Sequence, residues 1–419
     1  MRNSQEKSDL PGDDWIESII EKSQDLIISQ TEQEAISKLI EIIYSDAIAS
    51  SDRRLALAAA FDLLATAEYY RSVGHVGWVY CPADNSPLLL YPYTNVCPRC
   101  VLKNEFVFHK ANKPKSGVIG ARTSRLLAAF LQALFIKNNH SVEVRKGVEP
   151  VDLVILDQTQ TPIAVMFAEI KAAPLMTLPL ATPSQLFAED EDGLVVDVGH
   201  RVTDHSALYG SKLRLLLPNT SNENKNWELV PFGSKKNVRD ELWAYRSLLD
   251  LLNSNPMFMT RYISFWRSAL ASYEQKSQSD IFWLTNACGQ PSSRPTDWPR
   301  RSSASGYESI SDSKTSVGMD RTDDLKKATY QTLKIGAEGN PSSQYHYRVG
   351  IISNIHAVRH YEDYLTAIQD IVWTRHEDMF ARRAIDLPPE TPLFNLFDGI
   401  VALTEARTRD EWVSEIFDF

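Results

Sequence analysis

The chain has 419 residues, of which 43% are hydrophobic and 23% charged, and its formal net charge is −10. This composition is ordinary for a folded protein and leaves room for two or three domains. The acidic balance argues against a passive, non-specific nucleic-acid binder, although a locally basic cleft can lie in an acidic surface.

No uncharged apolar run approaches the length that spans a bilayer, and residues 1–20 contain no apolar segment of a secretory signal. We therefore expect a cytoplasmic protein that does not use a membrane. Four cysteines in so long a chain do not make a disulfide framework. Three of them lie close together in the sequence, which indicates metal binding instead.

Residues 1–74 are expected to form a helical region. The apolar residues of 25–49 recur with a helical period, and residues 53–70 are rich in strong helix formers. Ser51 or Asp52 would cap the second of these helices, because a short oxygen-bearing side chain can accept a hydrogen bond from a free backbone N–H.

Residues 75–110 hold the clustered cysteines. Cys97-Pro-Arg-Cys100 forms a knuckle whose narrow turn aims two sulfurs at one ion, and Cys81-Pro is half of a second one. The pattern resembles a zinc ribbon that lacks its fourth cysteine, and it predicts a structural Zn²⁺. A histidine is the favoured fourth ligand. The candidates are His75, His109 and Asp84. Three buried or reactive thiols without a metal are the alternative.

A basic loop follows, with Lys113 and Lys115 beside Ser and Gly residues. It can hold phosphate oxygens, or it can simply be a solvated loop. Next, residues 121–138 predict a strong amphipathic helix and residues 141–145 a strand.

Two apolar runs, 151–157 and 164–171, then flank a polar turn and predict a β-hairpin. Alternate side chains of a strand share a face, so Glu169 and Lys171 point the same way, and a neighbouring strand can bring Asp152 beside them. Two carboxylates can hold a Mg²⁺ that keeps several waters, and a lysine can orient or deprotonate the attacking water. A salt-bridged strand end is the alternative.

Later elements are two helices at 240–252 and 259–273 and a buried strand at 281–284. Residues 290–316 are rich in Ser, Pro and Arg and lack any apolar period, so they predict a loop or a disordered segment. Its Arg300 and Arg301 could contact DNA, or the segment could be an idle linker.

A helix is expected to open at residues 320–331, followed by a strand at 345–353 and a helix at 357–375. Lys326 and Lys327 on the first of these helices are residue types that contact phosphates and base edges. A solvated helix face is the alternative.

The spacing from Asp152 to Glu169 and Lys171 resembles the motif of the PD-(D/E)XK nuclease superfamily, which includes most type II restriction endonucleases. Pro150-Val151-Asp152 stands where the family has Pro-Asp, with one residue inserted. The resemblance covers roughly residues 115–175. It implies a core of one helix, three antiparallel strands, then a helix and a strand, for which residues 281–284 are the candidate.

The same resemblance implies roles for the site residues. Asp152 and Glu169 would hold Mg²⁺ with the backbone carbonyl of Ile170, and Lys171 would position the attacking water. Cleavage would leave a 5′-phosphate. Glu143 and Glu149 are possible accessory carboxylates.

We therefore expect a mixed α/β fold. Its predicted parts are a helical region (1–74), a zinc-ribbon-like module (75–110), a catalytic core with an insertion (111–290), a flexible segment (291–318) and a C-terminal α/β region for DNA recognition or core completion (319–419).

The expected function is that of a type II restriction endonuclease, a homodimer that cuts double-stranded DNA with Mg²⁺ in restriction-modification defence. The CPRC module and residues 320–331 also resemble the ApaLI-like group of restriction enzymes. The alternatives are a modification-dependent or repair nuclease on the same core, a non-catalytic zinc-containing DNA-binding protein, and a structural protein.

Overall fold

The computed structural model describes residues 12–45, 48–81, 88–93, 95–101, 107–109, 115–183, 208–219, 226–274, 317–320, 322–338, 342–358, 360–373 and 393–419. The fold is mixed α/β, as predicted. The chain divides into two compact units. The first comprises Met1–Ile28, Gly120–Ala173 and Gly318–Phe419, and the second comprises Ser29–Ile119 and Pro174–Val317.

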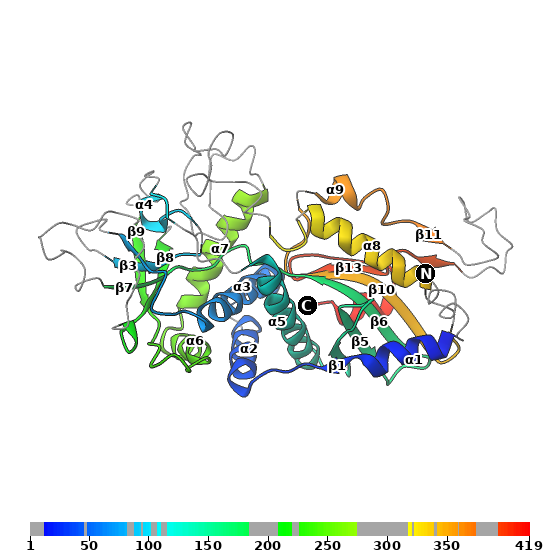
Figure 1. The fold of residues 1–419 in the computed structure, drawn as a ribbon. Coiled ribbons are helices and arrows are strands. Elements are labelled where there is room, and N and C mark those ends of the chain that lie inside the picture. Colours follow the sequence, from blue (N-terminus) through cyan, green and yellow to red (C-terminus); the bar gives the residue numbers. More distant parts are fainter. Residues whose placement is uncertain are drawn as a thin grey trace, which may run out of the picture. The chain divides into compact units, whose positions relative to one another are not determined.

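The first unit is built on a seven-stranded mixed sheet (Figure 1). In spatial order its strands are β1 (Gln24–Asp25), β4 (Glu143–Lys146), β5 (Leu153–Asp157), β6 (Ile163–Lys171), β10 (Tyr345–Ser353), β13 (Gly399–Ala402) and β14 (Ala406–Thr408). Strand β10 runs parallel to β6 and β13, and the other neighbours are antiparallel. The carboxyl ends of β6, β10 and β13 therefore meet at one end of the sheet, where Ser353 lies beside both Lys171 and Ala402.

The predicted hairpin is confirmed. Strands β5 and β6 pair antiparallel with Leu153 opposite Ala168, and β4 pairs with the far side of β5. Residues 153–157 and 164–170 are all buried. Strands covered on both faces carry nearly continuous apolar sequence, which explains the two runs in the chain.

The strand beside β6 is β10, which lies far downstream in the sequence. The predicted strand at 281–284 lies outside the described residues. Helix α8 (Thr322–Glu338) precedes β10 and packs against both β6 and β10. A crossover helix of this kind is expected, because two parallel strands cannot be joined by a tight turn.

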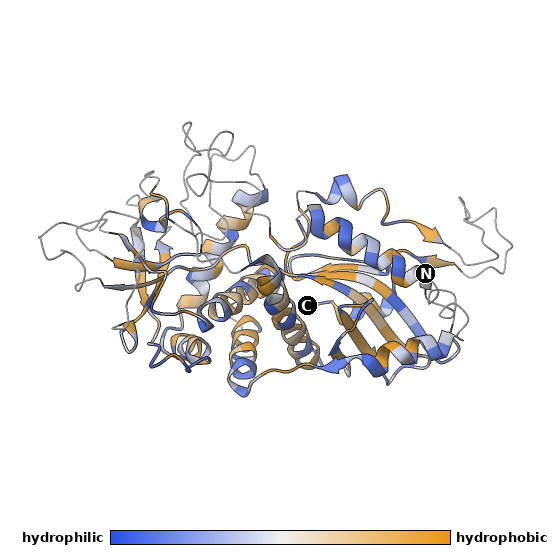
Figure 2. Ribbon diagram, viewed as in Figure 1, coloured by the Kyte–Doolittle hydropathy of each residue, from blue (hydrophilic) through white to orange (hydrophobic). Residues whose placement is uncertain are grey.

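One face of this sheet is covered by α8 and by α1 (Gly12–Lys22). The core residues of this layer are Ile16, Ile19, Val154, Leu156, Val165, Phe167, Ile335, Tyr347 and Val349, with Val151. In Figure 2 both helices carry hydrophilic as well as hydrophobic residues, as expected of helices with one buried side. Since side chains alternate along a strand, Glu169 and Lys171 share the face of Val165 and Phe167.

Contrary to the expectation from the sequence, helix α5 (Ser116–Lys137) is long and apolar enough to cross a membrane by length and composition. More than half of its apolar window, 56%, is buried inside the fold. Its Gln132 side chain bonds to the backbone of Val142 and Val144, and Phe135 packs against Phe417 beyond the C-terminal helix α10 (Glu411–Ile416). These contacts are those of a core helix.

The second unit combines an antiparallel sheet with four helices of ten or more residues among its described residues. The strands, in spatial order, are β2 (Val79–Cys81), β3 (Leu88–Tyr91), β7 (Leu180–Pro183), β8 (Arg214–Asn219) and β9 (Asn226–Pro231). The helices are α2 (Gln30–Ile43), α3 (Arg53–Arg71), α6 (Trp243–Ser254) and α7 (Phe258–Glu274), with the short η1 (Ser50–Asp52) and α4 (Pro98–Val101). Helix α3 contacts the other three long helices and is buried on all sides from 56 to 70.

Some predicted boundaries need correction. Helix α2 is shorter than the predicted 25–49, because Gln24 and Asp25 pair with β4 and Ser29 caps the helix. Asp52 is the N-cap residue of α3, but its side chain makes no capping bond. The predicted helix at 357–375 is reduced to α9 (Tyr361–Tyr364), since β11 (Val372–Trp373) pairs with β12 (Phe394–Asn395).

Candidate functional site

The ends of β5 and β6 bring Asp152 to Glu169. The backbone N–H of Asp152 donates to the carbonyl of Ala168 at 3.2 Å, and its Oδ2 accepts from the N–H of Ile170 at 3.2 Å. Asp152 thus bonds to the residues on either side of Glu169, so its position is set by the backbone of β6.

A tight loop delivers Asp152 to this position. The N–H of Gly147 donates to the carbonyl of Asp152 at 2.9 Å, and the N–H of Val151 donates to the carbonyl of Val148 at 3.3 Å. A Cβ atom on Gly147 would lie 2.4 Å from the carbonyl oxygen of Val151, well inside contact distance. The loop therefore requires glycine for close backbone approach.

Lys171 completes the cluster. Its Nζ donates to Oε1 of Glu169 and lies 3.6 Å from Oδ2 of Asp152. The side chains of Glu169, Lys171 and Asp152 are 7%, 19% and 44% exposed, respectively. The cluster is therefore buried at Glu169 and open to solvent at Asp152, which is the side from which a substrate or an ion can enter.

The charge of the cluster is not balanced. Burial, together with the neighbouring charge of Asp152, raises the pKa of Glu169 to about 7, and the ammonium of Lys171 opposes this rise without cancelling it. When both carboxylates are ionised they share a single ammonium, and a bound cation would supply the missing positive charge.

The residue types fit Mg²⁺, a hard cation that is often held by one or two carboxylates and keeps several waters. The two possible accessory carboxylates, Glu143 and Glu149, pair with basic side chains outside the cluster. Glu143 accepts from Nε of Arg145 at 2.7 Å, and Glu149 lies 3.6 Å from Nζ of Lys334. The carbonyl of Ile170 stays a predicted ligand.

Two buried side chains that the sequence analysis missed hold the segment after Lys171. The carboxamide of Asn354 accepts from the N–H of Ala173 at 3.1 Å and donates to its carbonyl at 2.8 Å. The hydroxyl of Thr123 donates to the carbonyl of Ala172 at 2.7 Å. No motif marks either residue, because a single Asn after a strand or a Thr in a helix carries no spacing signal.

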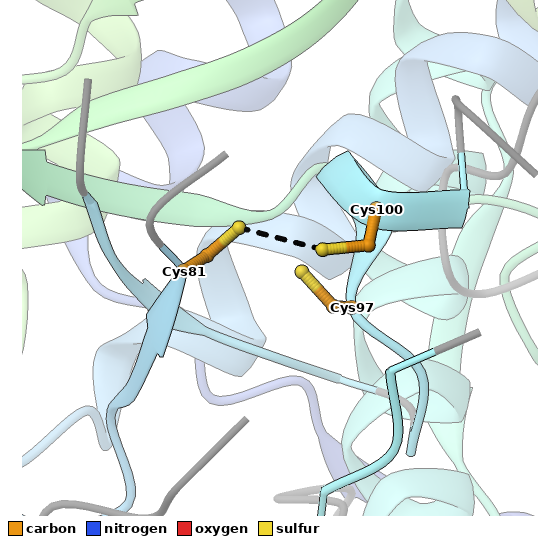
Figure 3. A group of neighbouring side chains, drawn as sticks. All are labelled: Cys81, Cys97 and Cys100. Atoms are coloured by element: carbon orange, nitrogen blue, oxygen red, sulfur yellow. Dashed lines mark hydrogen bonds between the residues drawn. The ribbon is translucent and has the colours of Figure 1, made fainter. Parts of the chain in front are cut away.

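The three clustered cysteines converge in the second unit (Figure 3). Cys81 ends β2, and Cys97 and Cys100 lie at and within α4. Their sulfurs all lie within 4.8 Å of one another, and those of Cys81 and Cys100 are 3.7 Å apart. The thiols are buried, and the neighbouring thiols together with burial raise the pKa of Cys97. Three buried cysteines this close together could hold a metal ion.

Within the described part of the chain, neither candidate histidine joins the three cysteines. Neither His75 nor His109 belongs to the group of ligand atoms around the three sulfurs. The ring of His75 packs against Tyr209 instead, with 5.9 Å between ring centroids. Asp84 lies outside the described residues. Spacing along the sequence could not decide between these candidates, because the distance of each side chain from the metal depends on how the chain folds.

Three of the six predicted DNA-contact residues lie in the described part of the chain. Lys115, Lys326 and Lys327 are exposed, and Nζ of Lys326 lies 5.4 Å from the ring centroid of Tyr364. Lys113, Arg300 and Arg301 lie outside the described residues. Contact with DNA stays a prediction for all of them.

No family model, no curated protein and no solved structure matches this chain.

Proposed function

We propose that this chain is a Mg²⁺-dependent endonuclease of the PD-(D/E)XK superfamily, of the type II restriction class, that cuts double-stranded DNA. The observation that carries the proposal is the convergence of Asp152, Glu169 and Lys171. A single lysine ammonium lies within ion-pair distance of two carboxylates, one just before β5 and one on β6, in a partly buried cluster.

The chain order supports this proposal. Helix α5 is followed by the antiparallel strands β4, β5 and β6, and after the inserted elements β7 to α7 of the second unit, α8 leads into β10 beside β6. This is the order of helix, three strands, helix and strand that the resemblance implies. The C-terminal region would then complete the core, with β10 in the place for which residues 281–284 were the candidate.

The proposed chemistry assigns one task to each side chain. Bound Mg²⁺ would stabilise charge on a phosphate oxygen and make a water more acidic. Asp152 and Glu169 would hold the ion, and Asp152 is exposed enough to share it with solvent and substrate. Lys171 would orient the attacking water. The water oxygen bonds to phosphorus, the bond from phosphorus to the 3′ oxygen breaks, and that oxygen takes up a proton to leave a 5′-phosphate at the neighbouring nucleotide.

Exposed lysines would contact the DNA backbone. Lys326 and Lys327 lie on α8, which packs on the sheet that carries the site, and Lys115 immediately precedes α5. Such contacts neutralise phosphates, so binding should weaken steeply as salt increases. We further propose a homodimer, because two sites related by a two-fold axis can cut both strands of a palindrome.

A structural zinc at Cys81, Cys97 and Cys100 is a separate proposal. Zn–S bonds of about 2.3 Å in a tetrahedron place sulfurs roughly 3.8 Å apart. The separation of 3.7 Å between Cys81 and Cys100 agrees with that edge. The ion would tie the start of the second unit's sheet to α4, and the fourth ligand would come from outside the three cysteines.

Digestion of a mixed-sequence phage DNA in Mg²⁺ tests the nuclease. Wild type and the control Glu415→Ala, an exposed carboxylate on α10, should give discrete bands that Asp152→Ala does not give. A smear that Asp152→Ala abolishes would keep the metal chemistry and remove site specificity. No cutting by wild type on methylated or unmethylated DNA would refute the nuclease. Salt-dependent DNA binding without cutting would then favour a non-catalytic DNA-binding protein.

Elemental analysis tests the zinc. Purified wild type and Cys288→Ser should carry about one zinc per chain, and a Cys97→Ser, Cys100→Ser double variant should carry none and melt at a lower temperature. Substitution with Co²⁺ should give a thiolate charge-transfer band in the wild type only. The proposal would be contradicted if purified wild type carried no zinc and the double variant melted at the same temperature as wild type.

A further inference from the structure

The backbone that follows Lys171 is held by side chains and loops from three separate stretches of the first unit. The carboxamide of Asn354 bonds to both the N–H and the carbonyl of Ala173, at 3.1 and 2.8 Å. The N–H of Gly318 shares the same carbonyl at 2.9 Å. Thr123 bonds the preceding carbonyl from α5 at 2.7 Å.

The Asn354 carboxamide does here what a paired peptide group does inside a sheet. Strand β10 pairs with β6 up to Ser353 beside Lys171, and both strands end there. The side chain of the next residue, Asn354, then supplies one donor and one acceptor to Ala173. The segments that follow β6 and β10 therefore stay joined beyond the last hydrogen bond between the two strands. Asn354 is completely buried, so water does not compete for these groups.

Lys171 has reason to need such support. It is the last residue of β6, and strand ends without partners fray. Its ammonium must stay in contact with Glu169 and within 3.6 Å of Asp152. A backbone free to move at residues 172 and 173 would let the ammonium leave this position.

We propose that Asn354 is a positioning residue for Lys171: its two bonds to Ala173 fix the end of β6 and keep the lysine ammonium between the two carboxylates. The effect on cleavage rests on the proposed nuclease function, whereas the effect on the position of Lys171 does not. Thr123 supports the same segment through Ala172.

Gln132 provides a matched control. It is also a carboxamide that bonds a backbone carbonyl and a backbone N–H, of Val142 at 2.9 Å and of Val144 at 2.7 Å. It does so at the start of β4, which β5 separates from β6. Asn354→Ala and Gln132→Ala therefore remove the same two types of bond, but only the first lies next to Lys171.

The first arm measures Lys171 directly. The lysine side chains are labelled with ¹³C-methyl groups and observed by NMR. The resonance that is missing in Lys171→Arg is that of Lys171, and the NMR spectra of the other variants are then compared with that of wild type. Asn354→Ala should shift or broaden this resonance, and Gln132→Ala should leave it in place. Thr123→Val, which keeps the shape of the side chain but loses the donor, should give a smaller change. This variant also serves if Asn354→Ala does not fold.

The second arm measures cleavage under single-turnover conditions. A misplacement of about 1 Å can lower a rate by roughly 100-fold. We expect the single-turnover rate constant to fall about 10- to 100-fold in Asn354→Ala while the enzyme concentration for half-saturation of the DNA is unchanged, and Gln132→Ala to keep its rate once folded. Equal Lys171 spectra and rates in the two variants would overturn the inference while leaving the nuclease intact. Failure of wild type to cut would refute the nuclease alone, since the spectra still decide the position of Lys171.

Discussion

Nζ of Lys171, the last residue of β6, lies 3.6 Å from Oδ2 of Asp152, the residue before β5. This proximity follows from register. Leu153 pairs with Ala168, so the preceding Asp152 comes opposite Glu169, and Lys171 shares the face of Glu169. A slip of one residue would send the carboxylate and the ammonium to opposite faces. The hairpin register therefore decides whether the site exists.

Replacing Lys171 with Met should abolish most cleavage and retain DNA binding. The side chain keeps much of its length but loses the charge that lies between the two carboxylates. A positioned acid–base group typically contributes about 10²- to 10⁴-fold to a rate, and we expect a loss in this range. Single-turnover cleavage measures the rate, and fluorescence anisotropy in Ca²⁺ measures binding.

Lys212→Met is the control for the Lys171 variant, because Lys212 is an exposed lysine in the second unit. It should cut and bind like wild type. Full cleavage by Lys171→Met would remove Lys171 from the catalytic site. A parallel loss of DNA binding would instead identify it as a phosphate contact.

Gly147→Ala should impair both stability and cleavage. The new methyl would lie 2.4 Å from the carbonyl of Val151, so the loop that carries Asp152 must move. Overpacking of this kind costs about 1–3 kcal/mol of the free energy of unfolding. Urea denaturation gives the stability, and cleavage by the folded fraction reports the displacement of Asp152.

Gly120→Ala is the matched control for Gly147→Ala. Gly120 lies in α5, and its new methyl would meet nothing within 4 Å. A helical Gly-to-Ala change should stabilise the protein by up to about 1 kcal/mol. Equal effects of the two substitutions would show that the loop adapts and that glycine is not required at position 147.

The hairpin could be predicted from the sequence because its signals are local. Two apolar runs flank a short polar turn, and the period of two along a strand places Glu169 and Lys171 on one face. The same is true of α3, whose helix formers at 53–70 match the observed Arg53–Arg71. Neither inference needs any knowledge of distant residues.

The neighbour of β6 could not be predicted in this way. Parallel strands are joined by long crossovers without a turn signature, so the sequence offers residues 281–284 as the candidate and does not indicate that β10 takes this place. The same limit applies to Asn354, whose two bonds to Ala173 exist only because β10 lies beside β6. It also applies to the fourth ligand of the cysteine cluster, since His75 is close in sequence yet packs on Tyr209.

Asp62→Ala should destabilise the second unit by several kcal/mol. Oδ2 of this fully buried carboxylate accepts from the N–H groups of Leu175 and Met176, at 2.8 and 2.9 Å, and from Nε1 of Trp266 at 2.7 Å. Each donor left without a partner costs about 1–3 kcal/mol. Urea denaturation followed by tryptophan fluorescence measures the change. Asp250→Ala, an exposed change on α6, should stay within about 0.5 kcal/mol of wild type. A small effect of Asp62→Ala would mean that water replaces the carboxylate.

His356 should make the first unit acid-sensitive. Burial lowers the pKa of His356 to about 4, while the charge of Glu405 opposes this and that of Arg407 adds to it. The side chain is 3% exposed, and Nε2 lies 3.9 Å from Oε2 of Glu405. In the unfolded chain a histidine has a pKa of about 6.5. The unfolded state therefore takes up a proton first, and this contribution to stability is complete above pH 6.5 and is lost as the pH falls towards 4.

The comparison of wild type with His356→Phe isolates this effect, because phenylalanine fills a similar volume and does not titrate. The free energy of unfolding of wild type should fall between pH 6.5 and 4 by up to about 3 kcal/mol more than that of the variant. The difference between the two proteins is needed because burial also raises the pKa of Asp398 to about 6, which favours the folded state as the pH falls through the same range. Urea denaturation at intervals of half a pH unit gives both curves. Parallel curves would show that His356 is protonated to the same extent in the folded and unfolded states, and would remove it as a source of acid sensitivity.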